Sequence, residues 1–248
     1  DERWLERPFF VMAEMPGRAA NPFEPGVYGA TAERTGEEFW AILGRIAATP
    51  VPGTPLAERL VVPAPDACWR QELARWEKVI DDDELEPQPI VRAGTRWLKR
   101  NPPPPPPRVA IVHGDFRSGN FLFGDDGGIR AILDWEMCHL GDPLEDLGWA
   151  LDPLWAGDEP QRPGQLIARD RALSLWQETS GIVIDPAALR WWEVFAHVKG
   201  LAIWISGSRE YADGSNKDPI LLVSGWLCTA RHNEILADRL ARLLEEEA

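Results

Sequence analysis

The side chains best suited to chemistry lie between residues 113 and 134. Asp115, Asn120 and Asp134 offer carboxylate and amide oxygens, and His113 and Arg117 belong to the same polar stretch. Hard oxygen ligands of this kind suit Mg²⁺, which takes one or two carboxylates together with substrate phosphates. The alternative is ordinary turn capping for the three oxygen-bearing residues and a solvated surface position for Arg117.

Two short β elements must bring these oxygens together. An apolar, β-branched run at 109–112 follows six prolines and is typical of a short buried strand. Apolar segments at 121–123 and 129–133 are joined by a Gly/Asp-rich turn that tolerates positive φ, so they are predicted to form a β-hairpin. Asn120 and Asp134 then lie at one end of this hairpin, with Asp115 on the preceding turn.

The stretch His113-Gly-Asp115-Phe-Arg117-Ser-Gly-Asn120, followed by Ile132-Leu-Asp134-Trp, resembles the catalytic core of the aminoglycoside phosphotransferase family. Those enzymes are kinase-like. The resemblance implies that Asp115 is the base that accepts the substrate hydroxyl proton and that Asn120 and Asp134 hold Mg²⁺. Arg117 stands where protein kinases place a lysine that meets the γ-phosphate.

The same resemblance assigns two supporting residues. His113 is expected to organise the catalytic loop without carrying a proton. Asp146, in Gly141-Asp-Pro-Leu-Glu-Asp146, is expected to hold that loop through hydrogen bonds to its backbone and not to bind metal.

The start of the chain resembles the junction between the two lobes of such enzymes. A bulky apolar segment at 8–12, stopped by Pro16-Gly17, is similar to the last strand of the N-terminal lobe and the hinge. By this resemblance Met12 lines the adenine pocket, and the backbones of Ala13 and Met15 pair with the adenine edge. The alternative is an ordinary edge strand that enters a turn.

The resemblance covers the hinge and the C-terminal lobe only. Kinase-like enzymes use a Gly-rich loop and a lysine–glutamate pair, and the seven residues before Pro8 cannot supply them. We therefore expect residues 1–17 to be the last N-lobe strand and hinge, and residues 18–248 to be a helical C-terminal lobe. The expected fold class is α+β, mostly α-helical, with a small central hairpin, and the chain is expected to be a fragment of a longer enzyme.

Apolar residues at helical spacing predict most of the remaining structure. A proline-rich connector is expected at 49–66, and tryptophans on the helical stripes are expected to be core residues. Substrate contacts are expected at 152–159 and in a polar break at 206–217. The predicted helices lie at 31–48, 68–82, 88–100, 165–180, 186–207 and 218–245.

Composition limits the classes of partner. The formal net charge of −14 argues against nucleic-acid binding, which needs a basic surface. The three widely spaced cysteines form no metal-binding pattern and favour a reducing compartment. No apolar run is long enough to cross a bilayer. We therefore expect a cytoplasmic protein with a small-molecule partner, and its oligomeric state stays open.

The expected activity is transfer of the γ-phosphate of ATP to a hydroxyl group of a small molecule, with Mg²⁺ as the metal. The residues around Arg117 and Trp135-Glu136 resemble the kinase-like relatives found beside acyl-CoA dehydrogenases. Two alternatives stay open. One is a pseudokinase-like binding or scaffold module, and the other is a metal-dependent hydrolase, although the chain lacks a histidine-rich ligand set.

Overall fold

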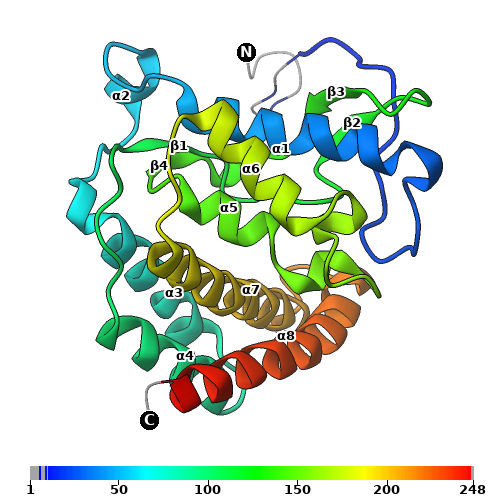
Figure 1. The fold of residues 1–248 in the computed structure, drawn as a ribbon. Coiled ribbons are helices and arrows are strands. Elements are labelled where there is room, and N and C mark those ends of the chain that lie inside the picture. Colours follow the sequence, from blue (N-terminus) through cyan, green and yellow to red (C-terminus); the bar gives the residue numbers. More distant parts are fainter. Residues whose placement is uncertain (1–5, 7–8, 10, 247–248) are drawn as a thin grey trace.

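A computed structural model of the chain describes residues 6, 9 and 11–246. Helices surround two small sheets in these residues, which confirms the expected α+β, mostly helical class (Figure 1). The α-helices are α1 (Ala32–Ala48), α2 (Pro55–Arg59), α3 (Cys68–Asp83), α4 (Pro89–Arg100), α5 (Leu144–Ala150), α6 (Arg169–Ser180), α7 (Pro186–Asp213) and α8 (Pro219–Glu246).

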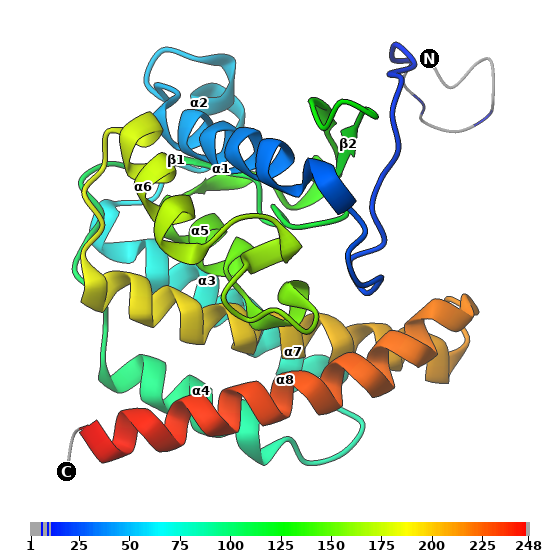
Figure 2. The ribbon, with the colours of Figure 1, turned by 45° about the vertical axis from the view of Figure 1, so that its right-hand side comes forward.

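Helix α7 is the centre of the larger helical layer. It packs against α8, α5, α3 and α4, and residues from all around its N-terminal two thirds are buried. A helix that is apolar on every side can only be stable inside other elements. Figure 2 shows α7 and α8 running side by side, while α1 and α6 pair on the opposite side of the molecule.

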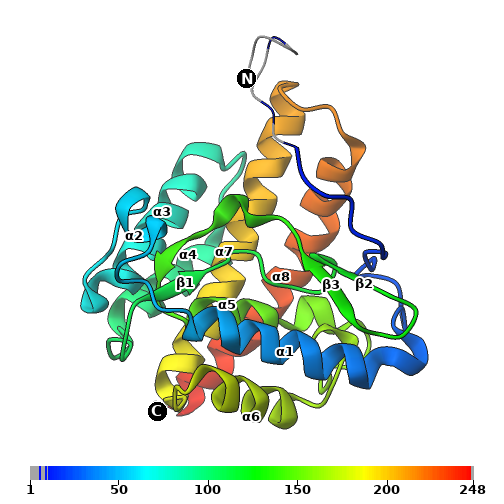
Figure 3. The same ribbon diagram turned by 90° about the horizontal axis from the view of Figure 1, so that it is seen from above.

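The strands form two antiparallel pairs. In one, β1 (Ala110–Val112) pairs with β4 (His139–Gly141), with Ile111 opposite Leu140. In the other, β2 (Phe121–Phe123) pairs with β3 (Ile129–Ile132), with Phe121 opposite Ile132. The predicted hairpin and the predicted first strand are thus confirmed, whereas β4 was not predicted. In Figure 1 both pairs lie above α7, and Figure 3, seen from above, shows β1 to the left of α7 and the β2–β3 hairpin to its right.

Most helix predictions are confirmed, with three corrections. Helix α6 begins at Arg169 instead of 165, because Gln165 has a positive φ of 62° and cannot continue a helix. The polar break expected at 206–217 is wrong: α7 continues to Asp213 and ends at Gly214, whose φ is 80°. The connector at 49–66 contains the short helix α2, which begins at Pro55.

The strand expected at 8–12 falls partly on Pro8 and Phe10, which lie outside the described residues. Phe9, Val11 and Met12 are not in a strand. Further along this segment, Arg18 forms an isolated β-bridge with Phe123, in which the two backbones exchange two hydrogen bonds of 3.0 Å.

The core confirms the interpretation of the aromatic stripes for most of the tryptophans, but Trp226 on α8, which was also expected to be a core residue, is 73% exposed. Six tryptophans are at most 1% exposed: Trp40, Trp149, Trp155, Trp176, Trp191 and Trp192. The three cysteines are free thiols. None of the helices in residues 11–246 is long and apolar enough to cross a membrane.

Candidate active site

The catalytic loop, residues 113–120, begins where β1 ends, and a buried carboxylate fixes its first turn. Asp146 on α5 accepts hydrogen bonds from the amides of His113 (2.6 Å) and Gly114 (2.9 Å), which are the backbone contacts expected of it. Burial raises the pKa of Asp146, and the charge of Lys199 and the hydrogen bond from the His113 amide oppose that rise. Gly114 has a φ of 88°, and a Cβ there would lie 2.6 Å from the carbonyl oxygen of Met137.

His113 ties this loop to the end of the hairpin. Its Nδ1 accepts a hydrogen bond from the amide of Asp115 (3.1 Å), so its Nε2 must carry the proton that is donated to the carbonyl of Leu133 (2.8 Å). Both ring nitrogens are therefore engaged, in a neutral ring. This geometry agrees with a structural role for His113.

Three side chains hold the carboxylate of Asp115. Oδ1 accepts from Trp149 Nε1 (2.7 Å) and Arg117 Nε (3.1 Å), and Oδ2 accepts from Asn120 Nδ2 (2.6 Å). A carboxylate oxygen can accept two hydrogen bonds, so Oδ2 retains one acceptor position. The side chain is 14% exposed, so this position can be reached from outside.

Arg117 is fixed beside Asp115. Its NH1 donates to the carbonyl of Ser118 (3.0 Å), and its guanidinium carbon lies 4.8 Å from the centre of the Trp155 ring. Trp155 lies within the segment 152–159, where substrate contacts were expected. The aromatic face holds the planar cation in place without neutralising it.

Asn120 and Asp134 meet at the open end of the hairpin. The amide of Leu133 donates to the carbonyl of Asn120 (2.9 Å), so Asp134 directly follows the residue paired with Asn120. Asp134 is exposed and adopts a left-handed backbone, with φ 66° and ψ 57°. Such backbone strain in a residue other than glycine is concentrated at functional sites.

The oxygens at this end of the hairpin fit a magnesium ion. The amide NH₂ of Asn120 faces Asp115, because a carboxylate can only accept, so its Oδ1 points away from that carboxylate. This oxygen and the exposed Asp134 carboxylate are hard donors of the kind that Mg²⁺ prefers.

The residues assigned to adenine lie apart from regular structure. Met12, Ala13 and Met15 are exposed in a segment without helix or strand, and 67% of Met12 is accessible. Their role in nucleotide binding stays a prediction.

The sequence interpretation missed Trp149, which contacts Asp115 directly. One signal was present, because Trp149 follows Asp146 by three residues and so lies on the same face of a helix.

Residues 1–192 match the phosphotransferase enzyme family, abbreviated APH. Among curated relatives, acyl-CoA dehydrogenase family member 11 of Gallus gallus is 34% identical over 82 residues, which are 33% of this chain and 11% of the relative. Family member 10 of Mus musculus is 27% identical over 158 residues, which are 60% of this chain and 14% of the relative. The chain thus spans only a small part of the length of these relatives.

Solved structures agree in fold. A Ralstonia eutropha protein described as a candidate aminoglycoside phosphotransferase superposes with a TM-score of 0.73 at 21% identity, over 94% of this chain and 71% of that chain. An ethanolamine kinase from Plasmodium vivax superposes with a TM-score of 0.57 at 12% identity, over 91% and 65%. The helical lobe is therefore that of a kinase-like fold, and the chain belongs to the phosphotransferase enzyme family.

Proposed function

We propose that the complete gene product containing this chain transfers the γ-phosphate of ATP to a hydroxyl group of a small molecule. The observation that carries this proposal is the placement of Asp115. Its carboxylate has one open acceptor position and is hydrogen-bonded to Asn120, whose backbone pairs with Leu133 immediately before Asp134. Membership of the phosphotransferase enzyme family supports it.

Asp115 Oδ2 would receive the proton of the acceptor hydroxyl. The three donors from Asn120, Trp149 and Arg117 fix the direction of the carboxylate before the substrate arrives. Such pre-organisation accounts for most of the catalysis in phosphoryl transfer, where the protein mainly positions groups and stabilises charge.

Asn120 Oδ1 and the Asp134 carboxylate would hold Mg²⁺, which supplies charge neutralisation for the phosphates when it is bound. Arg117 would stabilise the charge on the transferred group. Its guanidinium needs little reorganisation, because Asp115, the Ser118 carbonyl and the Trp155 ring already hold it.

Nucleotide and acceptor binding extend this proposal beyond the catalytic loop. We assign the adenine contacts to the segment with Met12, Ala13 and Met15, and one side of the acceptor site to Trp155.

The net charge of −14 disfavours nucleic acid as a partner. Three free thiols support a reducing, cytoplasmic location.

The test is an Asp115→Asn substitution in the complete gene product. Removing a general base should lower kcat by about 10² to 10⁴-fold and spare nucleotide binding. ATP consumption against a panel of hydroxylated metabolites measures the first quantity, and calorimetry with ATP and Mg²⁺ measures the second.

Asp125→Asn is the matched control, because Asp125 is exposed in the hairpin turn and should be silent. Near-normal turnover of the Asp115 variant would remove Asp115 from the role of base. A wild-type protein that binds ATP and turns over no acceptor would instead favour the pseudokinase alternative.

A further inference from the structure

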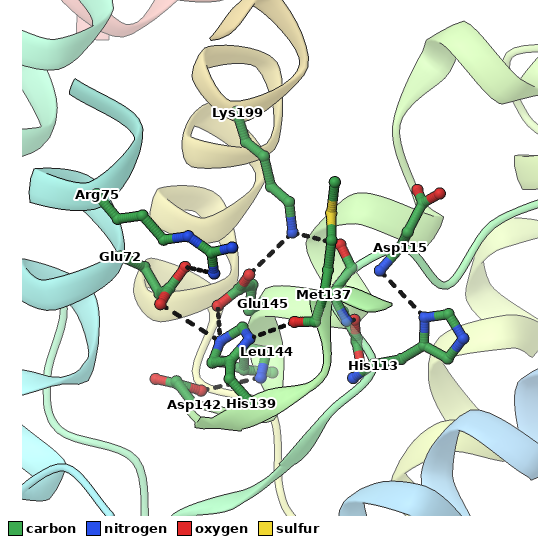
Figure 4. A network of polar contacts seen from close by, with 12 residues as sticks. Glu72, Arg75, His113, Asp115, Met137, His139, Asp142, Leu144, Glu145 and Lys199 are labelled. Atoms are coloured by element: carbon green, nitrogen blue, oxygen red, sulfur yellow. Dashed lines mark hydrogen bonds and ion pairs between the residues drawn. The ribbon is translucent and has the colours of Figure 1, made fainter. Parts of the chain in front are cut away.

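A lysine buried in the centre of the molecule reaches the catalytic loop. Lys199 on α7 is 1% exposed, and its Nζ lies 2.5 Å from the carbonyl oxygen of Gly114 (Figure 4). Lysine is rarely buried this completely unless it is paired, because its ammonium loses its hydration. Lys199 follows residue 192, the last residue that matches the family.

Gly114 is consequently held from two directions. Asp146 on α5 accepts from its N–H, and Lys199 on α7 donates to its carbonyl oxygen. That carbonyl belongs to the peptide that joins Gly114 to Asp115, so rotation of this peptide would move the Asp115 carboxylate. Glycine adopts the positive φ of 88° without steric cost, so these two contacts are what restrict the backbone here.

A carboxylate and two aromatic rings surround the ammonium group of Lys199. Its Nζ donates to Glu145 Oε1 (2.9 Å) and lies 5.7 Å and 5.5 Å from the ring centres of Trp76 and Trp149. Glu145 is itself 1% exposed. Burial would raise the pKa of Glu145, but Lys199 and His139 lower it to about 2.

On the side of Glu145 away from Lys199 lies His139, whose ring contacts two carboxylates (Figure 4). Its Nε2 is 3.1 Å from Glu145 Oε2 and 3.7 Å from Glu72 Oε1, and its Nδ1 donates to the carbonyl of Met137 (3.0 Å). Burial alone would lower the pKa of His139, but Glu145 and Glu72 raise it to about 9.

The Glu72–His139–Glu145 group also has ligand atoms close enough for a metal ion, all within 4.8 Å of one another. The balance of charge favours a proton on His139 over a metal ion at this group. Two carboxylates are balanced by Lys199 and a protonated His139, whereas a divalent ion in place of that proton would leave an excess buried positive charge. The group is therefore a chain of ion pairs that ends on Lys199.

We propose that Lys199 is a positioning residue of the phosphotransfer site, which orients Asp115 by fixing the Gly114 carbonyl. This inference rests on the proposed function. The ion pair with Glu145, which His139 contacts in turn, holds the ammonium in place. Lys199 acts through the Gly114 peptide and does not touch the reacting groups.

The experiment compares Lys199→Met, Glu145→Gln and the double variant in the complete gene product. Lys199→Met leaves the buried Glu145 without its ammonium partner and paired with His139 alone, so the midpoint of chemical denaturation should fall. The double variant removes both charges and should recover most of this stability. Lys99→Met is the control, because Lys99 forms an ion pair with Glu77 on the surface.

A positioning role and a purely structural role of Lys199 predict opposite values of kcat for the double variant. If Lys199 positions Asp115, kcat stays about 10²-fold below wild type despite the recovered stability, as expected for a base displaced by about 1 Å, and KM for ATP is unchanged. Recovery of kcat together with stability would show a purely structural role and overturn the proposal.

Hydrogen exchange provides a readout that needs no acceptor substrate. The amides of His113 and Gly114 should exchange at least about tenfold faster in the double variant than in the wild type, at matched global stability. Unchanged exchange would also overturn the proposal.

The Asp115→Asn variant separates the two ideas. If it retains normal turnover, Asp115 is not the base, and if the wild type turns over no acceptor, the proposed function fails; in both cases hydrogen exchange alone decides whether Lys199 fixes the loop. If it is inactive while the Lys199/Glu145 double variant has normal kcat, only the positioning role fails.

Discussion

Asp115 accepts hydrogen bonds from side chains that belong to two separate parts of the chain. Arg117 and Asn120 come from its own loop, whereas Trp149 comes from α5. The indole N–H can only donate, so it stabilises the ionised carboxylate and fixes Oδ1 in place. Trp149 therefore contributes directly to the orientation of the base.

Trp149→Phe should lower kcat by about 10 to 100-fold, because a hydrogen bond to a charged group is worth about 1.5 to 3 kcal/mol. Trp176→Phe is the matched control, since Trp176 on α6 is equally buried, lies outside the candidate site and its Nε1 has no hydrogen-bond partner in the part of the chain that the structure describes. Steady-state kinetics of both variants measure the difference. Equal losses in kcat would contradict a specific role for the indole N–H of Trp149.

The site residues that lie close together in the sequence could be predicted, whereas those contributed by helices far along the sequence could not. The spacing of Asp115, Asn120 and Asp134 along one loop and hairpin predicted that they would share an end of that hairpin. Trp149 and Lys199 reach the loop from helices whose positions depend on tertiary packing. Their spacing along the sequence carries no such information.

The close approach of α5 and α7 is what brings Glu145 to Lys199. A Cβ at Gly148 would lie 2.7 Å from the carbonyl oxygen of Trp192, so α5 can contact the α7 backbone only because residue 148 is glycine. Backbone atoms cannot move aside as a flexible side chain can. Asp146, Glu145 and Trp149 lie on the same short helix and would move with it.

Gly148→Ala should lower the free energy of unfolding by about 1 to 3 kcal/mol, because the two helices must separate. Chemical denaturation measures this loss, and kcat should fall with it because Asp146 and Trp149 shift. Gly207→Ala is the comparison at an uncrowded helix position. A Cβ there would meet only Leu221, at 3.4 Å, so the free energy of unfolding should rise by about 0.4 to 1 kcal/mol. A neutral Gly148→Ala would contradict this account of the α5–α7 contact.

Helices whose apolar residues recur at a regular spacing were predicted to within a few residues of their observed bounds. The exceptions have physical causes. Helices α1, α3 and α4 follow apolar spacing closely. The strand β4 has only three residues and takes its stability from pairing with β1, so it leaves no periodic signal. The C-terminal end of α7 is polar because it extends beyond the core, although it remains helical.

The buried charges link the stability of the whole molecule to pH. The pKa of His139 is raised from 6.5 to about 9, so its stabilising contribution is complete below pH 6.5 and is lost as the pH rises through 9. Glu145, with a pKa lowered to about 2, contributes above pH 4.5 and loses its effect in acid. Asp142, whose pKa burial raises to about 6, completes its titration before pH 7.

Between pH 7 and 9.5 the free energy of unfolding should therefore fall by about 2 to 3 kcal/mol. Urea denaturation across this range measures the slope. His139→Gln should be less stable at pH 7 and should show a flatter curve. An equally steep curve in that variant would assign the alkaline loss to another group.

The order of the sequence places the partners of the catalytic loop after the loop itself. Asp146, Trp149 and Lys199 all follow residue 120, and Lys199 comes from the helix around which the other helices assemble. During synthesis on the ribosome, a nascent chain that has not yet released α7 has no donor for the Gly114 carbonyl. The catalytic loop would therefore reach its working conformation only after α7 has emerged, about 80 residues later in the chain than the loop itself.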